Sequence, residues 1–269
     1  DDLSRAYRLV LRGCAPGDKV VFVEDDESRF DLHLIKGPFK FLASVYAKKL
    51  PRKVARLLAR KRSRGRSSMG TKYQVPYTMQ SGWPDTSVGD TLCNFALKAW
   101  YHKLGRNWVT VVCGDDSLTI TTQSELDRLD REHGMSAREV YAAAGMEIEF
   151  VVSDDWSKVS FCSMNLIANG DGFALACRPG KLIARMGWDM KDRRGKHQLG
   201  WLRGIGETLI RARHDPLMVA LGGRILRHTV GVRTILEHNP YKLSYDGTGH
   251  IRPEDVYAFY LRRYNAQHS

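Results

Sequence analysis

Short runs of β-branched and aromatic residues alternate with longer amphipathic stretches over the first two thirds of the chain. Six runs have the pattern of strands and fall at 19–25, 108–113, 117–121, 146–152, 159–168 and 173–177. Apolar residues at helical spacing predict helices over 3–12, 39–62 (broken near Pro51), 87–104 and 124–144. Beyond residue 178 only helical patterns recur, over 181–190, 199–213, 216–226 and 254–264. The order predicts an α+β part up to about Cys177 and an all-helical part after it.

Tight turns join two of the predicted strand pairs. Gly114-Asp115-Asp116 separates the runs 108–113 and 117–121, and the stretch 169–172 (Asn-Gly-Asp-Gly) separates 159–168 from 173–177. Glycine next to Asp or Asn supplies the backbone conformations that two-residue hairpin turns need. We therefore expect Asp115 and Asp116 at the tip of an antiparallel hairpin.

The helix predicted over 87–104 has a clear apolar stripe. Asp85 or Thr86 can cap its start. Its stripe consists of Val88, Leu92, Phe95, Ala96, Ala99 and Trp100. The pattern predicts that this stripe, including Trp100, packs into the core.

Charge and composition narrow the class of protein. The 269 residues contain 42 Lys and Arg against 30 Asp and Glu, a net charge of +12, which favours an anionic partner such as nucleic acid, nucleotide or membrane headgroups. A hydrophobic content of 43% excludes a disordered or fibrous chain. The five cysteines lack a CxxC pair, which excludes a zinc ribbon, and no apolar run is long enough for a transmembrane segment. Because the chain begins Asp1-Asp2 without an initiating Met, we expect it to be a piece of a longer protein.

The charges are unevenly distributed. No acidic residue lies between Asp31 and Asp85, whereas the same segment holds thirteen Lys and Arg residues. A solvated protein face usually mixes both signs, so this segment is better suited to contacts with phosphates. Acidic residues instead gather in short clusters at 24–27, 115–116 and 154–155. Because like charges repel, such clusters favour bound divalent metal.

Four blocks occur in an informative order. Asp26 to Asp31 has the pattern D-x4-D, the stretch 81–86 reads Ser-Gly-Trp-Pro-Asp-Thr, 113–116 reads Cys-Gly-Asp-Asp, and 161–163 reads Phe-Cys-Ser. These blocks resemble motifs A (26–31), B (81–94), C (113–116) and E (161–163) of viral RNA-dependent RNA polymerases. The resemblance covers about 19–178, and the wording of 28–33 is closest to the tombusvirus- and flavivirus-like groups of positive-strand RNA viruses.

The resemblance implies a catalytic centre. Asp26 and Asp115, with Asp116 assisting, would bind two Mg²⁺ or Mn²⁺ ions that bring an RNA 3′-hydroxyl to the α-phosphate of a nucleoside triphosphate. Asp25 is the structural alternative to Asp26. Successive residues of a strand face opposite sides, so only one of the two can point to the site, and the motif spacing favours Asp26.

Further residues would contact nucleotide and template. By resemblance, Asp31 would sense the ribose 2′-hydroxyl, Ser81 and Gly82 would form a mobile loop beside the template, and Thr86 would brace it. Two positions depart from the family pattern. Asp90 stands where motif B usually has Asn, and Asn94, one turn further along the same helical face, is a candidate substitute for reading the 2′-hydroxyl.

The second departure concerns the general acid for the pyrophosphate leaving group. The motif D lysine (motif D at about 145–158) has no clean match, and Lys158 is our candidate. It could equally be an ordinary surface lysine.

The implied architecture is a right-hand polymerase palm over 1–177, with an RRM-like antiparallel sheet and flanking helices, followed by an α-helical thumb over 178–269. The palm would contain a basic fingers-type insertion around 36–80, and the basic motif F and most of the fingers would precede residue 1. RNA template and product, nucleoside triphosphates and other viral replication proteins would be the partners. The family places such enzymes in the host cell cytoplasm, at membrane-associated replication complexes. The candidate RNA contacts are Arg60, Arg62, Arg64, Arg66, Lys72 and Arg178.

Two other functions fit part of the pattern. A reverse transcriptase shares the palm, but Cys113 stands where Tyr or Phe is expected, two residues before Asp115. A non-enzymatic basic RNA-binding or packaging protein would use the acidic clusters as surface turns. Viral RNA synthesis explains the basic segment and the spaced aspartates together.

Overall fold

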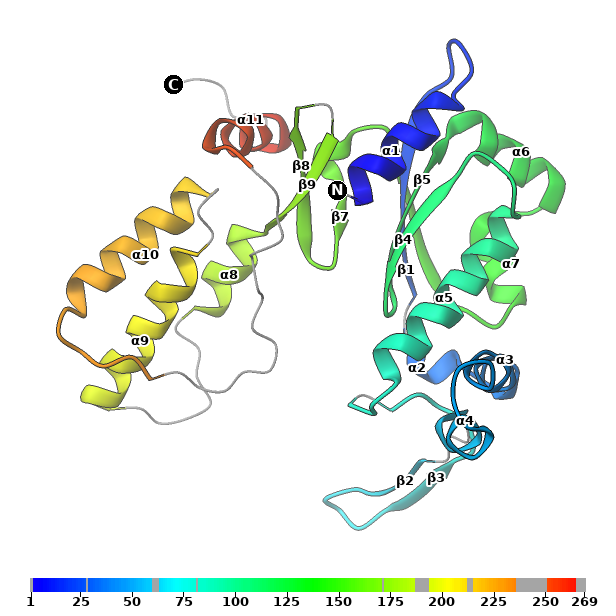
Figure 1. Cartoon of the computed structure of the whole chain (residues 1–269), viewed down its shortest axis with the longest axis horizontal. Helices are drawn as coiled ribbons and strands as arrows, with labels where there is room; N and C mark the ends of the chain where they lie inside the picture. The colour runs from blue at the N-terminus through cyan, green and yellow to red at the C-terminus, as the bar shows by residue number, and fades with distance from the viewer. Residues whose placement is uncertain are drawn as a thin grey trace. The chain divides into compact units, whose positions relative to one another are not determined.

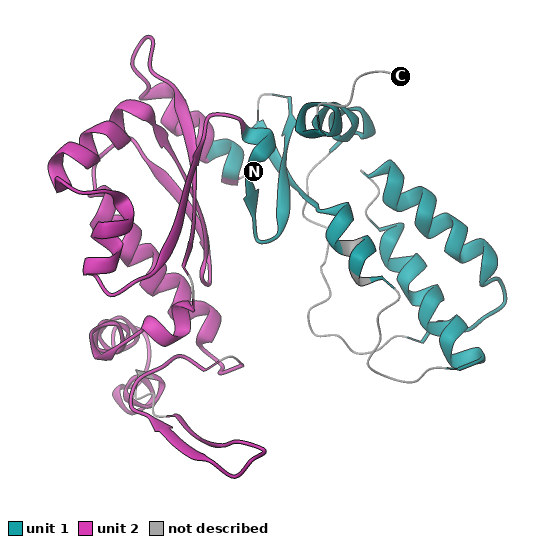
Figure 2. Ribbon diagram, turned by 180° about the vertical axis from the view of Figure 1, so that it is seen from behind, with its two compact units in different colours: residues 1, 3–5, 156–269 teal, residues 2, 6–155 magenta. Residues whose placement is uncertain are grey.

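The computed structural model describes residues 2–27, 29–59, 63–80, 82–170, 172–186, 194–211, 215–235 and 251–264. The chain forms two compact units (Figure 2). The N-terminal unit contains residue 2 and residues 6–155, and the C-terminal unit contains residues 1, 3–5 and 156–269.

A four-stranded antiparallel sheet forms the centre of the N-terminal unit (Figure 1). The strands are β1 (Val20–Glu27), β4 (Val109–Cys113), β5 (Asp116–Thr122) and β6 (Ile148–Ser153), in the order β4-β5-β1-β6. In the β1–β5 register Val20 pairs with Thr122 and Glu24 with Leu118. β1 is therefore an inner strand whose acidic end, Asp25-Asp26-Glu27, runs alongside the β4–β5 hairpin.

The two faces of this sheet have different neighbours. Val21 and Val23 of β1 pack in one core with residues of α5 (Thr86–His102), α6 (Gln123–His133) and α7 (Ala137–Ala143). Phe22 points to the other face, where it stacks on Tyr7 of α1 (Asp2–Arg12) with ring centroids 6.1 Å apart. We call the side of the sheet away from α5, α6 and α7 the open face. Even-numbered residues of β1 belong to the open face and odd-numbered residues to the helical face.

The basic segment folds into helices followed by a hairpin. After the short α2 (Phe30–His33) come α3 (Lys36–Tyr46) and α4 (Arg52–Ala59), which confirms two helices separated near Pro51. Their apolar residues, Phe39, Leu42 and Ala55, join the core that lies under the sheet. The segment then forms an antiparallel β2 (Ser63–Arg66) and β3 (Lys72–Val75) hairpin, which the sequence analysis did not predict.

Helix α5 packs with a different face from the one expected. Val88, Phe95 and Trp100 are 56%, 46% and 51% exposed, so their predicted burial was wrong, whereas Leu92 of the same stripe packs against the core. The buried face consists of Gly89, Asp90, Cys93, Asn94, Lys98, Tyr101 and His102. The reason is electrostatic: this face lies against the acidic end of β1 and the Gly114–Asp115 turn, where polar partners are needed.

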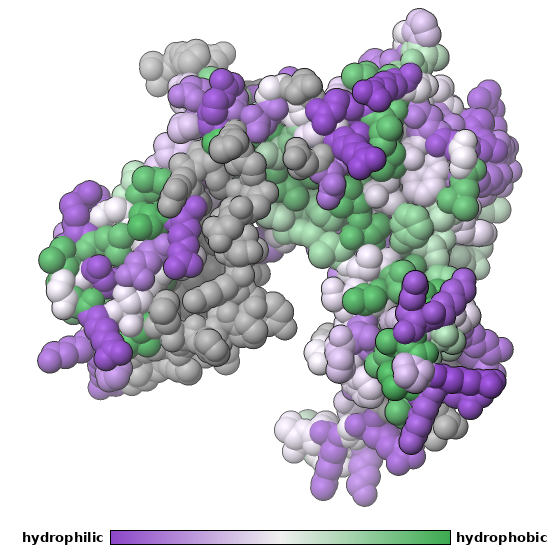
Figure 3. Space-filling view, viewed as in Figure 1, coloured by the Kyte–Doolittle hydropathy of each residue, from purple (hydrophilic) through white to green (hydrophobic). Residues whose placement is uncertain are grey.

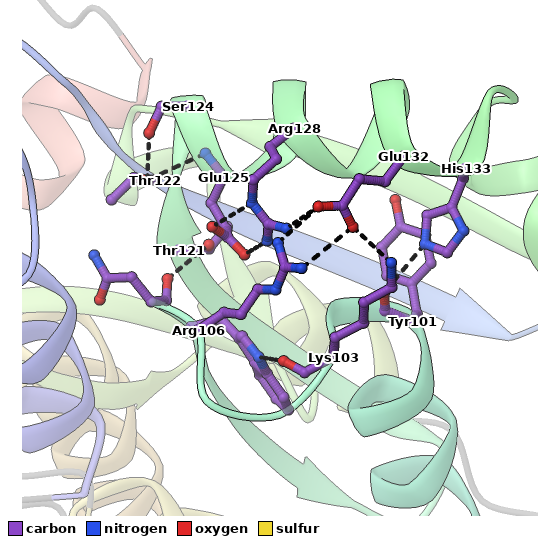
Figure 4. Close-up of polar contacts among 12 residues, drawn as sticks. Tyr101, Lys103, Arg106, Thr121, Thr122, Ser124, Glu125, Arg128, Glu132 and His133 are labelled. Carbon is purple, nitrogen blue, oxygen red and sulfur yellow. Dashed lines mark hydrogen bonds and ion pairs between the residues drawn. The ribbon is translucent and has the colours of Figure 1, made fainter.

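A network of ion pairs fastens the end of α5 to α6 (Figure 4). Glu132 of α6 accepts hydrogen bonds from Lys103 and Arg106, which follow α5, and from Arg128 on its own helix. His133 contacts the carbonyl of Tyr101 at 3.2 Å. Several charges sharing one carboxylate hold geometry better than isolated surface pairs do. The network thus links the residues that follow α5 to α6.

His102, at the end of α5, makes the fold sensitive to acid. Its ring is fully buried, and among the described residues neither ring nitrogen has a hydrogen-bond partner. Burial, aided by the charges of Lys98 and His133, lowers its pKa to about 3. The unfolded chain binds this proton near pH 6.5, so stability is complete above that pH and falls as pH drops toward 3.

We expect His102→Phe to reduce this acid-induced loss of stability. Between pH 7.5 and 4.5 the wild-type chain should lose about 2–3 kcal/mol more unfolding free energy than the variant, because each of the roughly two pH units below 6.5 costs about 1.4 kcal/mol. Urea unfolding at both pH values measures it. His197→Phe, at an exposed position, is the control and should behave as wild type. Equal acid sensitivity in His102→Phe and wild type would contradict the assignment.

The C-terminal unit begins with a small sheet. The 3-10 turn η1 (Trp156–Lys158) precedes β7 (Ser160–Phe161), β8 (Met164–Asn169) and β9 (Gly172–Cys177), which form an antiparallel sheet. Ile167 and Ala176 pack on Val256 and Phe259 of α11 (Pro253–Tyr264). The predicted palm boundary at Cys177 thus falls within this unit, at the end of β9.

Helices dominate the remainder, as the sequence predicted. They are α8 (Pro179–Arg185), α9 (Lys196–Leu209) and α10 (Pro216–His228). Asp215 caps α10 by accepting from the backbone of Leu217 and Met218, as expected from the Asp-Pro start. In the described part of the chain, no helix combines the length and apolar character needed to cross a membrane. The division into palm and thumb remains a prediction.

Candidate active site

Three consecutive acidic residues at the end of β1 face alternate sides of the sheet. Asp25 and Glu27 are buried on the helical face, whereas Asp26 is exposed on the open face. Asp26 pairs with Glu149 of β6 in the strand register, so the exposed Glu149 shares its face. Of these residues, Asp26 is therefore the one that β1 exposes on the open face.

The two-residue loop of the β4–β5 hairpin lies within the expected Gly-Asp-Asp stretch and consists of Gly114 and Asp115, whereas Asp116 is the first residue of β5. Cys113 pairs with Asp116, and Gly114 has φ +69°. A positive φ at only the first loop residue is the type II′ pattern, in which glycine is strongly favoured. The turn exposes the side chains of Asp115 and Asp116. Extended by two residues, the β1–β5 register places Asp26 opposite Asp116.

Helix α5 holds this turn from below. The backbone N–H of Gly114 donates to the hydroxyl of Thr91 at 2.8 Å. The amide nitrogen of Asn94 donates to the carbonyls of Gly114 at 3.2 Å and of Asp115 at 2.8 Å. Asn94 is fully buried. Its amide is thus committed to the turn, an arrangement that favours a positioning role over ribose recognition.

Replacing Asn94 separates these two roles. We expect Asn94→Ala to slow nucleotide incorporation by about tenfold to a hundredfold, because a small displacement of a catalytic group has that effect. The preference for NTP over dNTP should stay unchanged, since the amide faces the turn. Steady-state kinetics with both substrates measures this.

Asn107→Ala is the matched control, because Asn107 also donates its amide to a carbonyl, that of Val10 at 3.1 Å, away from the aspartates. It should leave incorporation within about threefold of wild type. A selective loss of ribose discrimination in Asn94→Ala would instead support the sequence-based interpretation.

The three exposed aspartates of β1 and the hairpin have the donor chemistry for divalent cations. Asp26, Asp115 and Asp116 supply only carboxylate oxygens, the ligands that Mg²⁺ takes in ones and twos together with substrate phosphates. Within the described ranges, no group of three or more His, Cys, Asp or Glu side chains is arranged to hold a metal. Asp26 and Asp115 are the residues that would hold the ions, because carboxylates are the protein ligands that Mg²⁺ prefers.

On the helical face of β1, a buried lysine pairs with the two buried carboxylates. The ammonium of Lys98 lies 2.5 Å from Asp25 and also donates to Glu27, and all three side chains are fully buried. Burial raises the pKa of Glu27 to about 7, and Lys98 opposes this rise. The charge of Asp115 also raises the pKa of Glu27, so Asp115 lies within electrostatic range of the end of β1. Burial likewise raises the pKa of Asp25.

The motif B loop is tied to its surroundings. The hydroxyl of Thr86 donates to the carbonyl of Gln80 at 2.6 Å, which closes the loop that Thr86 was expected to brace. Asp31, in α2, accepts at its carbonyl from the N–H of Met79 at 3.2 Å. Gly82 is exposed with φ +85°, a conformation that favours glycine. Ser81 lies outside the described residues.

Asp90 is buried on α5, one turn before Asn94. Lys158 is exposed in η1 of the C-terminal unit, and Arg178 is half-buried after β9. The roles of Asp90, Lys158 and Arg178 remain predictions.

The Cys162–Ser163 turn joins β7 to β8, and both residues have positive φ (49° and 60°), which is rare without glycine.

The candidate RNA contacts that are described belong to the β2–β3 hairpin. Arg64, Arg66 and Lys72 are exposed and share one side of this ribbon, because Arg64 pairs with Gln74 and Arg66 with Lys72. Hydrophilic side chains gather over this end of the unit (Figure 3). Tyr73 lies on the other side, across Gly65, where a Cβ would come 2.2 Å from the Tyr73 hydroxyl. Arg60 and Arg62 lie outside the described residues.

Sequence reasoning missed three residues of the site: Thr91, Lys98 and Glu149. Asp90, Asn94, Lys98 and His102 recur every four residues, a polar stripe that signals contact with a charged or polar neighbour. Glu149 carried no comparable signal, because its position depends on the β1–β6 register.

Comparison with protein-family models matches residues 18–208, well over half of the chain, to the family described as viral RNA-dependent RNA polymerase. No curated protein matches the chain. The matched range contains all three aspartates and the basic hairpin.

Proposed function

The chain belongs to the family of viral RNA-dependent RNA polymerases, and from this premise we propose that it adds nucleoside monophosphates to an RNA 3′-hydroxyl at Asp26 and Asp115. The observation that carries the proposal is the separation of acidic residues across β1. Asp26 is exposed beside the Gly114–Asp115 turn, whereas its neighbours Asp25 and Glu27 are buried against Lys98.

The chemistry needs two oxygens aligned at one phosphorus. Two divalent ions held there would clamp the attacking and leaving oxygens of the in-line displacement and stabilise the developing charge. Asp26 and Asp115 orient this centre from two strand ends, and Asp116 assists from the first residue of β5. Thr91 and Asn94 keep the turn in place, so little reorganisation is needed during the reaction.

Other residues would serve binding and proton transfer. Asp31 lies at the end of the motif A pattern and would contact the ribose, and Asp90 of α5 is a second candidate for the 2′-hydroxyl. The loop of Ser81 and Gly82, closed by Thr86, would lie beside template and nucleotide. Lys158 would donate the proton that pyrophosphate needs on leaving.

The partners follow from this reaction: RNA as template and product, nucleoside triphosphates, and other viral replication proteins. We also propose a place in the tombusvirus- or flavivirus-like groups, and action in the host cytoplasm at membrane-associated replication complexes. The motif wording around Arg29 and Asp31 supports the first point, and family resemblance alone supports the second.

We propose that the basic side of the β2–β3 hairpin contacts RNA phosphates. Replacing Arg64, Arg66 and Lys72 together with Ala should weaken RNA binding and reduce the slope of log affinity against log salt by about 2, since each lost phosphate contact on a single strand contributes about 0.7. Fluorescence anisotropy over a range of salt concentrations measures this slope.

The control is Lys48→Ala/Lys49→Ala/Lys53→Ala, which removes the same charge from exposed positions at and near α4. It should change the slope by less than half as much. Equal slopes in the two variants would mean that net charge, rather than the hairpin, attracts RNA.

The choice of substrate tests the proposed function against reverse transcription. On a primed RNA template, the full chain should incorporate NTP at least about a hundredfold more efficiently than dNTP, equivalent to about 2.7 kcal/mol. A preference for dNTP would overturn the proposal.

A further inference from the structure

Helix α5 buries four polar side chains in one row. Asp90, Asn94, Lys98 and His102 are spaced four residues apart and are between 0% and 5% exposed. Residues at this spacing lie on one side of a helix. Asn94 holds the catalytic turn, and Lys98, one turn further, meets the acidic end of β1. One row of side chains thus contacts both strand ends that carry the proposed catalytic aspartates.

Lys98 is enclosed by groups that fix it. Its ammonium reaches both Asp25 and Glu27 and lies 4.9 Å from the ring centroid of Tyr141. Asp25 also accepts from the hydroxyls of Ser117 and, at 3.4 Å, of Tyr141. The lysine therefore joins the two odd-numbered carboxylates of β1 from the side opposite Asp26.

Stability alone gives little reason for such a cluster. Desolvating three charged groups costs several kcal/mol each, and well-packed apolar residues in place of buried ions are often equally or more stable. Two carboxylates also face one cation here. Where buried ions are retained, fixing one strand register among alternatives is their best-attested use.

The register of β1 decides which of its acidic residues faces the open side of the sheet. With Asp25, Asp26 and Glu27 in a row, a shift by one residue would turn Asp26 inward and Asp25 and Glu27 outward, because strand side chains alternate. At the C-terminal end of β1 the hydrophobic pattern cannot distinguish one strand register from another, because all three residues there are acidic. In the observed register Lys98 bonds Asp25 and Glu27, so it holds these two carboxylates on the helical face and leaves Asp26 on the open face.

We propose that Lys98 is a positioning residue: by binding Asp25 and Glu27 on the helical face, it keeps Asp26 facing the metal ions on the open face. The proposal rests on the function proposed above, because it presumes that Asp26 is a metal ligand. Lys98 touches neither substrate nor metal. It acts through the backbone of β1, by holding Asp25 and Glu27 on the helical face.

Binding of Mn²⁺ to the full chain tests this without an activity assay. Electron paramagnetic resonance titration gives the Kd for wild type, Lys98→Met, Lys98→Arg and Asp26→Asn. Lys98→Met should raise the Kd by about tenfold or more, the usual effect of losing a residue that orients metal ligands. Lys98→Arg keeps the charge and should recover part of the affinity. Circular dichroism checks that each variant is folded.

A destabilised control separates positioning from general loss of structure. Leu129→Ala removes a fully buried side chain of α6 and should lower stability while leaving the Mn²⁺ Kd within about twofold of wild type. If Lys98→Met does not fold, Lys98→Met/Glu27→Gln, which leaves one buried carboxylate, takes its place with the same expected rise in Kd.

The outcomes are distinct. A wild-type Kd in Lys98→Met or its double variant, together with lost binding in Asp26→Asn, would overturn the positioning role alone. Wild-type binding in Asp26→Asn would overturn the metal-binding function itself.

Discussion

Asp115→Asn should abolish nucleotide incorporation while leaving RNA binding intact. The amide keeps the size of the side chain at the exposed hairpin tip but removes the charge that would hold a metal ion. Metal stabilisation of the transition state is worth several kcal/mol, so we expect a loss of about a thousandfold or more. Single-turnover incorporation measures the rate, and RNA affinity should stay within about twofold because the basic hairpin is unchanged.

Asp154→Asn is the matched control for this variant. Asp154 is an exposed aspartate of the same unit, paired only loosely with Lys19 at 3.6 Å. It should retain incorporation near the wild-type rate. Wild-type activity in Asp115→Asn, or equal losses in both variants, would show that Asp115 is an ordinary polar turn residue.

Asp25→Leu should lower the stability of the fold, whereas substitution of Asp26 should abolish incorporation and leave stability almost unchanged. It leaves the buried ammonium of Lys98 without one of its two carboxylates and also removes the acceptor of the Ser117 hydroxyl. Breaking a buried ion pair from one side costs about 3–5 kcal/mol. Because Glu27 still pairs with Lys98, we expect a loss near the lower end, about 3 kcal/mol, in urea unfolding.

Asp26→Asn provides the comparison within β1. Its side chain is exposed on the open face, and replacing it should change the unfolding free energy by less than about 0.5 kcal/mol while abolishing incorporation. The two adjacent aspartates thus separate stability from catalysis. Similar stability changes in Asp25→Leu and Asp26→Asn would contradict the alternation on which the site depends.

Local chemistry accounts for the parts of the fold that could be predicted. The Gly114–Asp115 hairpin follows from a glycine whose positive φ the turn requires, between two β-branched runs. The Asp215-Pro216 start of α10 follows from capping chemistry. The predicted helix 124–144 ends early and restarts, because Gly134 adopts φ +66° and Ser136 with Glu139 forms a capping box. Both signals were present in the sequence.

Other features depended on tertiary contacts. The apolar stripe of Val88, Phe95 and Trp100 predicted the wrong buried face of α5, because the acidic end of β1 and the carbonyls of the hairpin turn attract Asn94 and Lys98 instead. Register between distant strands placed Glu149 beside Asp26. Periodicity within one segment does not contain these pairings.

The choice of Asp26 over Asp25 depended on motif spacing at the sequence level. The structure adds a physical cause, since Lys98 lies on the helical face and binds Asp25 and Glu27 there. Sequence patterns did not predict that Asp25 and Glu27 are buried with Lys98 while Asp26 is exposed.

Template-dependent incorporation tests the central claim most directly. The full chain is given one labelled NTP at a time, with Mg²⁺ and primed RNA templates that differ only in the first templating base. We predict that each template supports incorporation of its complementary nucleotide alone, and that Asp26→Asn and Asp115→Asn lose this reaction while still binding the RNA. Incorporation that ignores the template, or that persists at the wild-type rate in both variants, would contradict the account.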